Sequence, residues 1–137
     1  MSYLVDTNVL SELRRKSPDP RVVDWFALRP AGTLFVSVLT LGEIRKGVAA
    51  LPPSARRLAL LDWLETSLPA FFSGRVLSVD AEIADRWGRL MASAGRPLAS
   101  FDSLLVATAI RHGLTLVTRN LRDTQGLGVE VLCPWDA

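Results

Sequence analysis

YLVDTNVLSELRR, residues 3–15, joins a short apolar run to a stretch with helical periodicity through one carboxylate, Asp6. The run Tyr3–Val5 is typical of a buried strand, and apolar residues then recur at helical spacing from about Thr7 to Lys16. A carboxylate at such a junction is suited to cap the helix. It is equally well placed to bind a ligand if other acids reach the same edge of a sheet. The rest of the chain has to distinguish these two readings.

The same alternation of apolar runs and helical patterns continues to the end of the chain. The order of strands and helices predicts βα units and a mostly parallel central sheet, in a three-layer α/β/α sandwich. At 137 residues the chain has the length of one domain, residues 1–137. The expected further strands are 34–39, 75–79, 114–118 and 129–132, and the expected further helices are 21–28, 41–51, 54–68, 81–94 and 101–112.

Composition narrows the class of protein. Apolar residues make up 49% and charged residues 22% of the chain, which is typical of a globular protein and excludes disorder. Fourteen of the sixteen cationic residues are Arg, the side chain best suited to phosphate, which is a mild hint of a nucleic-acid partner. Cys133 is the only cysteine, which excludes an internal disulfide and a cysteine metal cluster. No leader-like or membrane-spanning pattern is visible, so we expect a cytoplasmic protein with no membrane association.

Four acidic residues are out of place among the fourteen. Asp6, Glu43 and Asp102 have apolar neighbours, and Asp123 lies just beyond the last long strand. Asp6, Glu43 and Asp123 are expected to follow the carboxyl ends of strands, and Asp102 to lie in the first turn of a helix. In an open α/β sheet, that edge is where ligands bind.

Each of these acids also has a purely structural explanation. Asp6 is a good helix cap. The sequence Thr40-Leu-Gly-Glu43 matches a capping box, in which Glu43 reaches back to the Thr40 amide. Asp102 in the first turn suits the helix dipole. Capping does not explain why several negative charges should share one edge, so a positive group is needed to offset them.

Two kinds of positive group are available. Arginine or lysine side chains are one, and those near the acids in sequence are Arg45, Lys46, Arg119 and Arg122. A divalent cation is the other. Oxygen ligands without nearby His or Cys favour Mg²⁺ or Mn²⁺ over Zn²⁺. Such an ion needs only one or two carboxylates, with waters and a substrate phosphate completing its shell.

Taken together, the motifs resemble the PIN domain, and the ending GLGVEVLCPW, residues 126–135, is similar to VapC toxins, particularly their FitB-like branch. The whole chain length fits this resemblance. Each motif is weak alone, but the ordered set is specific. The motifs are Asp6-Thr7-Asn8, Thr40-x-x-Glu43, Asp102 with Ala107-x-Ala109, and Thr118-Arg119-Asn120-x-x-Asp123.

The resemblance implies a Mg²⁺- or Mn²⁺-dependent endoribonuclease, the toxin of a type II toxin–antitoxin pair. The implied partners are an RNA substrate and a VapB/FitA-like antitoxin whose tail covers the acidic pocket. A homodimer is implied, within a heterotetramer or hetero-octamer with the antitoxin, and DNA would be reached only through the antitoxin.

Carried over position by position, Asp6, Glu43, Asp102 and Asp123 match the acidic quartet of the family, with Asp6 and Asp102 as principal metal ligands. Some PIN domains carry an acid near the place of Asn120, so the fourth position is open between Asn120 and Asp123. Glu43 and Asp123 are alternative general bases. The polar groups expected to orient ligands or water are Thr7, Asn8, Thr118 and Asn120, and the arginines available to the RNA backbone are Arg45, Arg119 and Arg122.

Two other functions compete with the nuclease. A phosphatase with an aspartyl nucleophile would need a second Asp two residues after Asp6, and that position is Asn8. A non-catalytic partner of a DNA-binding antitoxin, acting in operon autoregulation, would leave the acids as helix caps. The cluster Arg14-Arg15-Lys16 is likewise open between an RNA-facing patch and a solvated helix end.

Overall fold

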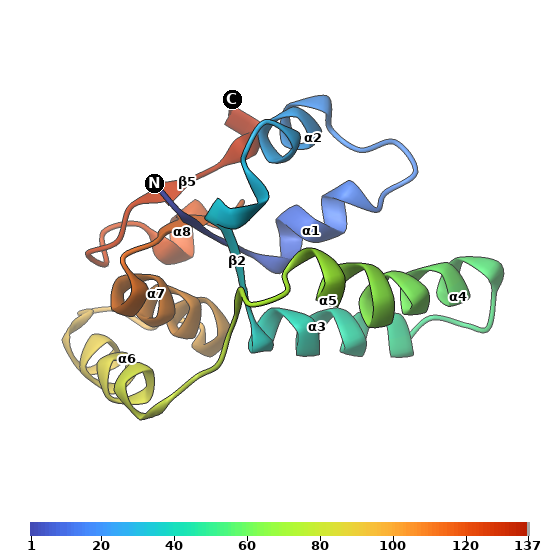
Figure 1. The fold of residues 1–137 in the computed structure, drawn as a ribbon. Coiled ribbons are helices and arrows are strands. Elements are labelled where there is room, and N and C mark those ends of the chain that lie inside the picture. The colour runs from blue at the N-terminus through green and yellow to red at the C-terminus, as the bar shows by residue number, and fades with distance from the viewer. Residues whose placement is uncertain (137) are drawn as a thin grey trace.

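A five-stranded parallel sheet forms the centre of the molecule in the computed structural model, which describes residues 1–136 (Figure 1). The strand order is β3-β2-β1-β4-β5, and each neighbouring pair is parallel. The strands are short, and the predicted strands at 75–79 and 129–132 are each reduced to two residues. Their bounds are β1 Tyr3–Val5, β2 Leu34–Ser37, β3 Val76–Leu77, β4 Thr115–Val117 and β5 Val131–Leu132.

The sheet is buried on both faces, as the apolar strands predict. Tyr3 and Val5 belong to one hydrophobic cluster and Leu4 to the other, because successive strand residues point to opposite faces. The first face is covered by helices α1 to α5 and the second mainly by α7, with α6 packed against α7. The predicted three-layer α/β/α sandwich is confirmed.

The helices follow the predicted order. Figure 1 shows α6 and α7 packed side by side, and α3 running alongside the α4–α5 segment. The helix bounds are α1 Thr7–Leu13, α2 Pro20–Ala27, α3 Val38–Ala49, α4 Ala55–Asp62, α5 Leu68–Phe71, α6 Ala81–Ser93, α7 Ser100–His112 and α8 Leu121–Thr124, with the 3₁₀ turns η1 Ala31–Thr33 and η3 Pro134–Asp136.

The capping-box prediction at Thr40 is wrong. Strand β2 ends at Ser37, two residues earlier than predicted, and the Ser37 hydroxyl caps α3 by accepting from the Leu39 amide at 3.1 Å. Thr40 is therefore buried inside α3, and Glu43 lies in the second turn of that helix rather than at its start. The apolar run continues past Ser37 because Val38 and Leu39 open the helix, which periodicity alone cannot separate from a strand.

The predicted helix 54–68 is one helical path with a wider turn inside it. Residues Trp63–Ser67 form the π-helical turn η2, in which the Leu68 amide donates to the Trp63 carbonyl. Pro69 follows, and it has no N–H to continue the α-helical ladder. A π turn is a recognised way to absorb such an interruption. Within the described chain, no helix combines enough length with enough apolar character to cross a bilayer.

Helix α1 ends three residues earlier than predicted, and a buried carboxylate holds the loop that follows. Glu12 is 4% exposed; its Oε2 accepts from the Asp19 amide at 2.9 Å and its Oε1 from Arg15 at 3.2 Å. The Asp19 amide lowers the pKa of the Glu12 carboxyl, and Arg15 adds to that effect. Asp19 in turn caps α2 by accepting from the Arg21 amide. Glu12 thus fixes the loop that leads into α2.

This contact makes part of the stability depend on pH. Because the pKa of Glu12 is lower in the folded state, its contribution is present above the ordinary glutamate pKa and is lost as pH falls through the folded value. We expect Glu12→Gln to lower the free energy of unfolding at pH 7 by about 1 kcal/mol, since a charged acceptor is replaced by a neutral one.

Urea denaturation at pH 7 and pH 3 measures this effect, and the difference from wild type should shrink at the lower pH. Asp85→Asn is the matched control, because Asp85 makes only an exposed i, i+4 pair with Arg89 and should change stability little. Equal midpoints for Glu12→Gln and wild type at pH 7 would contradict the bracing role of Glu12.

Candidate active site

The strand order places Asp6 at a topological switch point. The chain leaves β1 for β2 on one side and returns to β4 on the other, so the carboxyl ends of β1 and β4 lie next to each other without a direct connection. Val5 is in register with Val117, and the Asp6 amide donates to the Val117 carbonyl at 2.9 Å. Asp6 and Thr118 therefore meet at the position where open α/β sheets bind ligands.

Hydrogen bonds fix both oxygens of the Asp6 carboxyl, which is only 2% exposed. Oδ1 accepts from the Thr7 amide at 2.6 Å, so Asp6 caps α1 as predicted. Oδ2 accepts from the Thr118 hydroxyl at 2.7 Å, and the Asn8 side-chain amide lies 3.5 Å from the same oxygen. Capping and site formation are thus carried out by the same side chain.

The Thr118 hydroxyl uses its full hydrogen-bonding capacity. It donates its one proton to Asp6 and accepts from the Asn8 side chain at 3.3 Å and the Asn120 amide at 3.1 Å. The side-chain oxygen of Asn8, Oδ1, accepts from the Arg119 backbone amide at 3.3 Å. This network ties the start of α1 to the segment after β4 and fixes the orientation of the Asp6 carboxyl.

A pocket of about 490 Å³ opens beside this network. Glu43 reaches it from α3 and Asp102 from the first turn of α7, so three helices and the segment after β4 contribute to its wall. Glu43 is exposed, whereas Asp102 is 9% exposed. The residues that line the pocket are Asp6, Thr7, Asn8, Ser11, Glu43, Phe101, Asp102 and Asn120.

Burial and mutual repulsion act against ionisation of the two aspartates. Burial raises the pKa of Asp6 to about 6, against the lowering effect of Thr118 and Thr7, and the charges of Asp102 and Glu43 raise it further. Burial also raises the pKa of Asp102, Asn120 partly offsets that rise, and Asp123 and Glu43 add to it. Asp6, Glu43 and Asp102 therefore line one pocket, and neighbouring acids raise the pKa of both aspartates.

The donor set suits a hard divalent cation. Asp6 and Asp102 supply carboxylate oxygens, and the pocket wall adds amide and hydroxyl oxygens but no His or Cys. Among residues 1–136, no group of three or more His, Cys, Asp or Glu side chains is arranged to hold a metal by itself. Mg²⁺ does not require such a cage, because it binds through one or two carboxylates and keeps several waters. The residues present therefore fit Mg²⁺ or Mn²⁺.

The remaining predicted site residues lie further from the pocket. Asp123 is exposed on α8, a short helix that was not predicted, and it influences Asp102 without lining the pocket, whereas Asn120 does line it. Arg45 pairs with Glu65 at 2.9 Å, and the Arg119 guanidinium lies 4.8 Å from the Trp135 ring centre. Arg122 is exposed on α8, and its backbone carbonyl accepts from Arg96 at 3.2 Å. Contact of these arginines with RNA stays a prediction.

Two lining residues were not predicted from the sequence. Ser11 follows Thr7 by four positions on α1, and this spacing places both on one helix face. The i, i+4 spacing from Thr7 on a helix capped by Asp6 is therefore a sequence signal for Ser11. Phe101 precedes Asp102, and nothing in its sequence context distinguishes it from a core residue.

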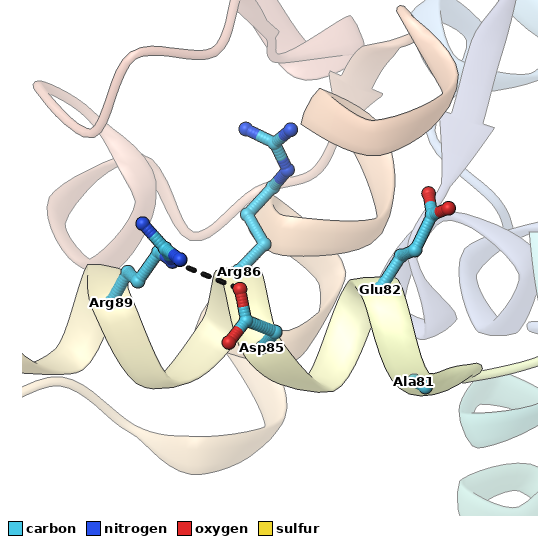
Figure 2. A pocket seen from close by; sticks show the side chains of 5 residues that line it. All are labelled: Ala81, Glu82, Asp85, Arg86 and Arg89. Atoms are coloured by element: carbon cyan, nitrogen blue, oxygen red, sulfur yellow. Dashed lines mark hydrogen bonds and ion pairs between the residues drawn. The ribbon is translucent and has the colours of Figure 1, made fainter.

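Another hollow, of about 570 Å³, lies along α6 and is lined by paired acids and by arginines (Figure 2). All its lining residues, Ala81, Glu82, Asp85, Arg86 and Arg89, come from one helix. Asp85 pairs with Arg89 at 2.9 Å, and Glu82 pairs with Arg111 of α7. Its acids are exposed and compensated, so the hollow lacks the buried, repelling carboxylates that mark the switch point.

The raised pKa of Asp6 should make the stability of the metal-free protein depend on pH. Its folded pKa of about 6 exceeds the ordinary value of 3.8, so the folded state binds the proton more tightly and the free energy of unfolding falls as pH rises from about 4 to about 6. We expect Asp6→Asn to be more stable than wild type at pH 7 by about 1–3 kcal/mol, since it removes a buried charge.

A carboxyl-detected NMR titration checks the pKa directly, and urea denaturation at pH 4 and pH 7 checks the linked stability. Asp62→Asn, at an exposed position on α4, is a control that should leave the pH dependence of wild type in place. An Asp6 carboxyl that titrates near pH 4 would contradict the expectation.

Comparison with known proteins shows the family to which the chain belongs. A model of the PIN domain matches residues 3–124. The toxin FitB of Neisseria gonorrhoeae is 35% identical over 135 residues, which are 96% of this chain and 97% of that protein. The VapC ribonuclease Y4jK of Sinorhizobium fredii is 34% identical over 97% of each chain. A solved structure of FitAB bound to the IR36 DNA fragment aligns with a TM-score of 0.91 at 32% identity, covering 97% of this chain and 95% of that one. This chain therefore belongs to the PIN domain family, in the group that includes the FitB and VapC toxins.

Proposed function

We propose that this protein is a divalent-metal-dependent endoribonuclease, the toxin of a toxin–antitoxin pair. The observation that carries the proposal is the pocket that Asp6, Glu43 and Asp102 share at the switch point of the sheet. Phosphodiester hydrolysis needs a cation-binding site open to a polyanionic substrate, and these acids supply it. Relatives with matching length and sequence are called a ribonuclease and a toxin, which supports the same function here.

Asp6 and Asp102 would hold the ion, Mg²⁺ or Mn²⁺. When bound, the ion would lower the pKa of a water and offset the negative charge of the phosphate in the transition state. The rest of the chemistry belongs to side chains of the chain itself. Thr118 and Asn8 hold the Asp6 carboxyl in one orientation before the substrate arrives, which removes a reorganisation step from the reaction.

Glu43 is the residue we assign as general base. It lines the pocket and is exposed, so it can take a proton from the attacking water and pass it to solvent. Asp123 does not line the pocket, and its role in this proposal is to act on Asp102 through its charge. Asn120, which does line the pocket, takes the fourth position as a neutral group.

The proposed partner is a VapB/FitA-like antitoxin, with the toxin as a homodimer inside a heterotetramer or hetero-octamer. The FitAB structure bound to DNA supports a second, compatible role in operon autoregulation, since DNA would be reached through the antitoxin. That role does not need the pocket acids. Substitution of Asp6 or Asp102 therefore separates the two functions.

The nuclease proposal predicts RNA cleavage that depends on both the metal and the two aspartates. Purified protein should cut single-stranded RNA with Mg²⁺ or Mn²⁺ and stop with EDTA. Asp6→Asn and Asp102→Asn should each lose at least about a hundred-fold in rate, because loss of a ligand should cost at least as much as loss of a group that orients one.

Asp85→Asn is the matched control, since it removes an aspartate that is exposed on α6 and takes no part in the pocket. Its rate should equal that of wild type. If folded Asp6→Asn and Asp102→Asn cut RNA as fast as wild type, the proposed function is wrong.

The Thr118 hydroxyl is expected to act through Asp6. Thr118→Val removes the 2.7 Å hydrogen bond to the carboxyl, so metal affinity should fall about 10- to 100-fold while the rate at saturating metal recovers. Titration of the cleavage rate with Mg²⁺ measures both quantities. Thr108→Val is the control, because Thr108 is also buried but donates within α7 to the Leu104 carbonyl. An unchanged Mg²⁺ dependence in Thr118→Val would contradict this positioning role.

A further inference from the structure

A second pocket of about 310 Å³ adjoins the acidic one and continues along the surface between α1, α3 and the α4–η2 segment. Thr7, Ser11 and Glu43 line both pockets, so the two form one continuous surface. Thr7 is buried, with only 9% of its surface exposed, and its hydroxyl makes no hydrogen bond within residues 1–136. Buried polar groups are nearly always paired, so an unpaired hydroxyl in the shared wall points to a ligand there.

The second pocket, which we call the Trp63 groove, has an apolar floor. Ile44, Val48 and Leu60 are buried there, and the half-buried Trp63 ring belongs to the same wall. Trp63 opens the π-helical turn η2, a kind of irregularity that is frequent at functional sites. The volume is at the lower end of the range of about 300–1,000 Å³ typical of small-ligand pockets. It therefore suits one flat group rather than a long segment.

Arginines surround this apolar floor. The Arg14 guanidinium lies over the Trp63 ring, 5.5 Å from the ring centre, so a base that enters the groove meets both flat groups. Arg56 donates to the Arg14 backbone carbonyl at 3.2 Å. Arg15 is held by Glu12, but neither Arg14 nor Arg56 forms an ion pair with an acid in the described part of the chain. A further hollow lined by Arg15, Lys16, Ser17 and Arg56 extends the cationic surface. Uncompensated cations beside an aromatic ring favour a ligand with both a flat face and negative charge.

We propose that the Trp63 groove binds the unpaired base of the nucleotide next to the scissile phosphate, with Arg14 and Arg56 on its backbone. This inference rests on the proposed ribonuclease function. Single-stranded nucleic acid is held by aromatic stacking platforms that are flanked by cations, and the groove supplies both. An RNA strand whose phosphate lies at Asp6 and Asp102 must continue along one of the adjoining surfaces. The Trp63 groove offers it apolar contact and positive charge.

A nucleotide fits these observations better than a peptide does. The groove begins at the pocket where the RNA phosphate must lie, and the change from acidic pocket to cationic rim provides the neutralisation that a phosphate chain needs to approach carboxylates. Trp63 and Arg14 act as positioning and specificity residues in this scheme, because they fix the strand and leave the reacting atoms to Asp6, Glu43 and Asp102.

The test pairs a protein variant with a matching RNA variant. Cleavage of a short single-stranded RNA by wild type first locates the scissile bond, and RNAs with one abasic ribose on either side of that bond are then prepared. One of the two abasic RNAs should lose about 5- to 100-fold in kcat/KM with wild type, the range expected for one stacking contact. With Trp63→Leu the same abasic RNA should be cut at nearly the rate of the intact RNA, because the stacking contact is already absent.

Arg56→Gln provides a second measurement that does not alter the apolar floor. Arg56 is exposed, so the variant should fold, and it should raise KM and weaken the salt dependence of KM while kcat changes little. Arg86→Gln on α6 is its matched control and should behave as wild type, since Figure 2 shows Arg86 on the separate α6 surface.

The outcomes separate this inference from the proposed function. If Asp102→Asn abolishes cleavage but the effects of Trp63→Leu and the abasic RNA simply multiply, the ribonuclease stands and the base-binding groove is refuted. Unchanged KM in Arg56→Gln, or unchanged cleavage of both abasic RNAs, also overturns the groove; this is the result expected if it holds a peptide instead. If wild type cuts no RNA with either metal, the function and the inference fall together.

Discussion

The hydrogen bond from the Thr118 hydroxyl to the Asp6 carboxyl is the contact on which the candidate site depends. It forms because β1 and β4 are parallel neighbours in a register that pairs Val5 with Val117, so the next residue on each strand meets the other. A shift by one residue would turn both side chains to opposite faces of the sheet. The orientation of the Asp6 carboxylate thus depends on the register of β1 and β4. Packing of apolar strand residues on both faces of the sheet maintains that register.

Burial of the Asp6 carboxyl at this position makes its charged form less stable. A carboxyl with a pKa near 6 is destabilised in its charged form by burial, and its neighbours Asp102 and Glu43 add repulsion. A residue that only caps a helix has a lower desolvation cost nearer the surface. Asp19 and Asp80 cap α2 and α6 in such less buried positions. Carboxyl groups with raised pKa values are common at functional sites. A bound divalent cation would stabilise the charged form of Asp6 and so offset the effect of burial and repulsion.

The sequence predicted the fold and the pocket acids well because both follow from local patterns. Alternating strands and helices determine the layers, and Asp6 is recognisable at its strand–helix junction. Glu43 was predicted as a pocket acid from its apolar neighbours and its place after a strand, and it does line the pocket. The competing explanation, a capping box that begins at Thr40, is wrong because α3 begins at Val38. The choice between Asn120 and Asp123 depends on α8, whose four residues carry no sequence pattern. Tertiary contacts alone determine which of them faces the pocket.

Negative and positive side chains lie on different sides of the pocket. The acids converge at the carboxyl ends of the strands, while Arg14 and Arg56 lie along one adjoining groove. On α6 the acids are paired, Asp85 with Arg89 and Glu82 with Arg111 of α7. A polyanion approaching the acids is repelled unless cations accompany it along its length, and only an asymmetric arrangement also fixes the sense in which the strand lies. The short loop after α1 is central here, because the buried Glu12 keeps Arg15 occupied and leaves the neighbouring Arg14 beside Trp63. A structural carboxylate thereby shapes the cationic side of a site whose chemistry belongs to other carboxylates.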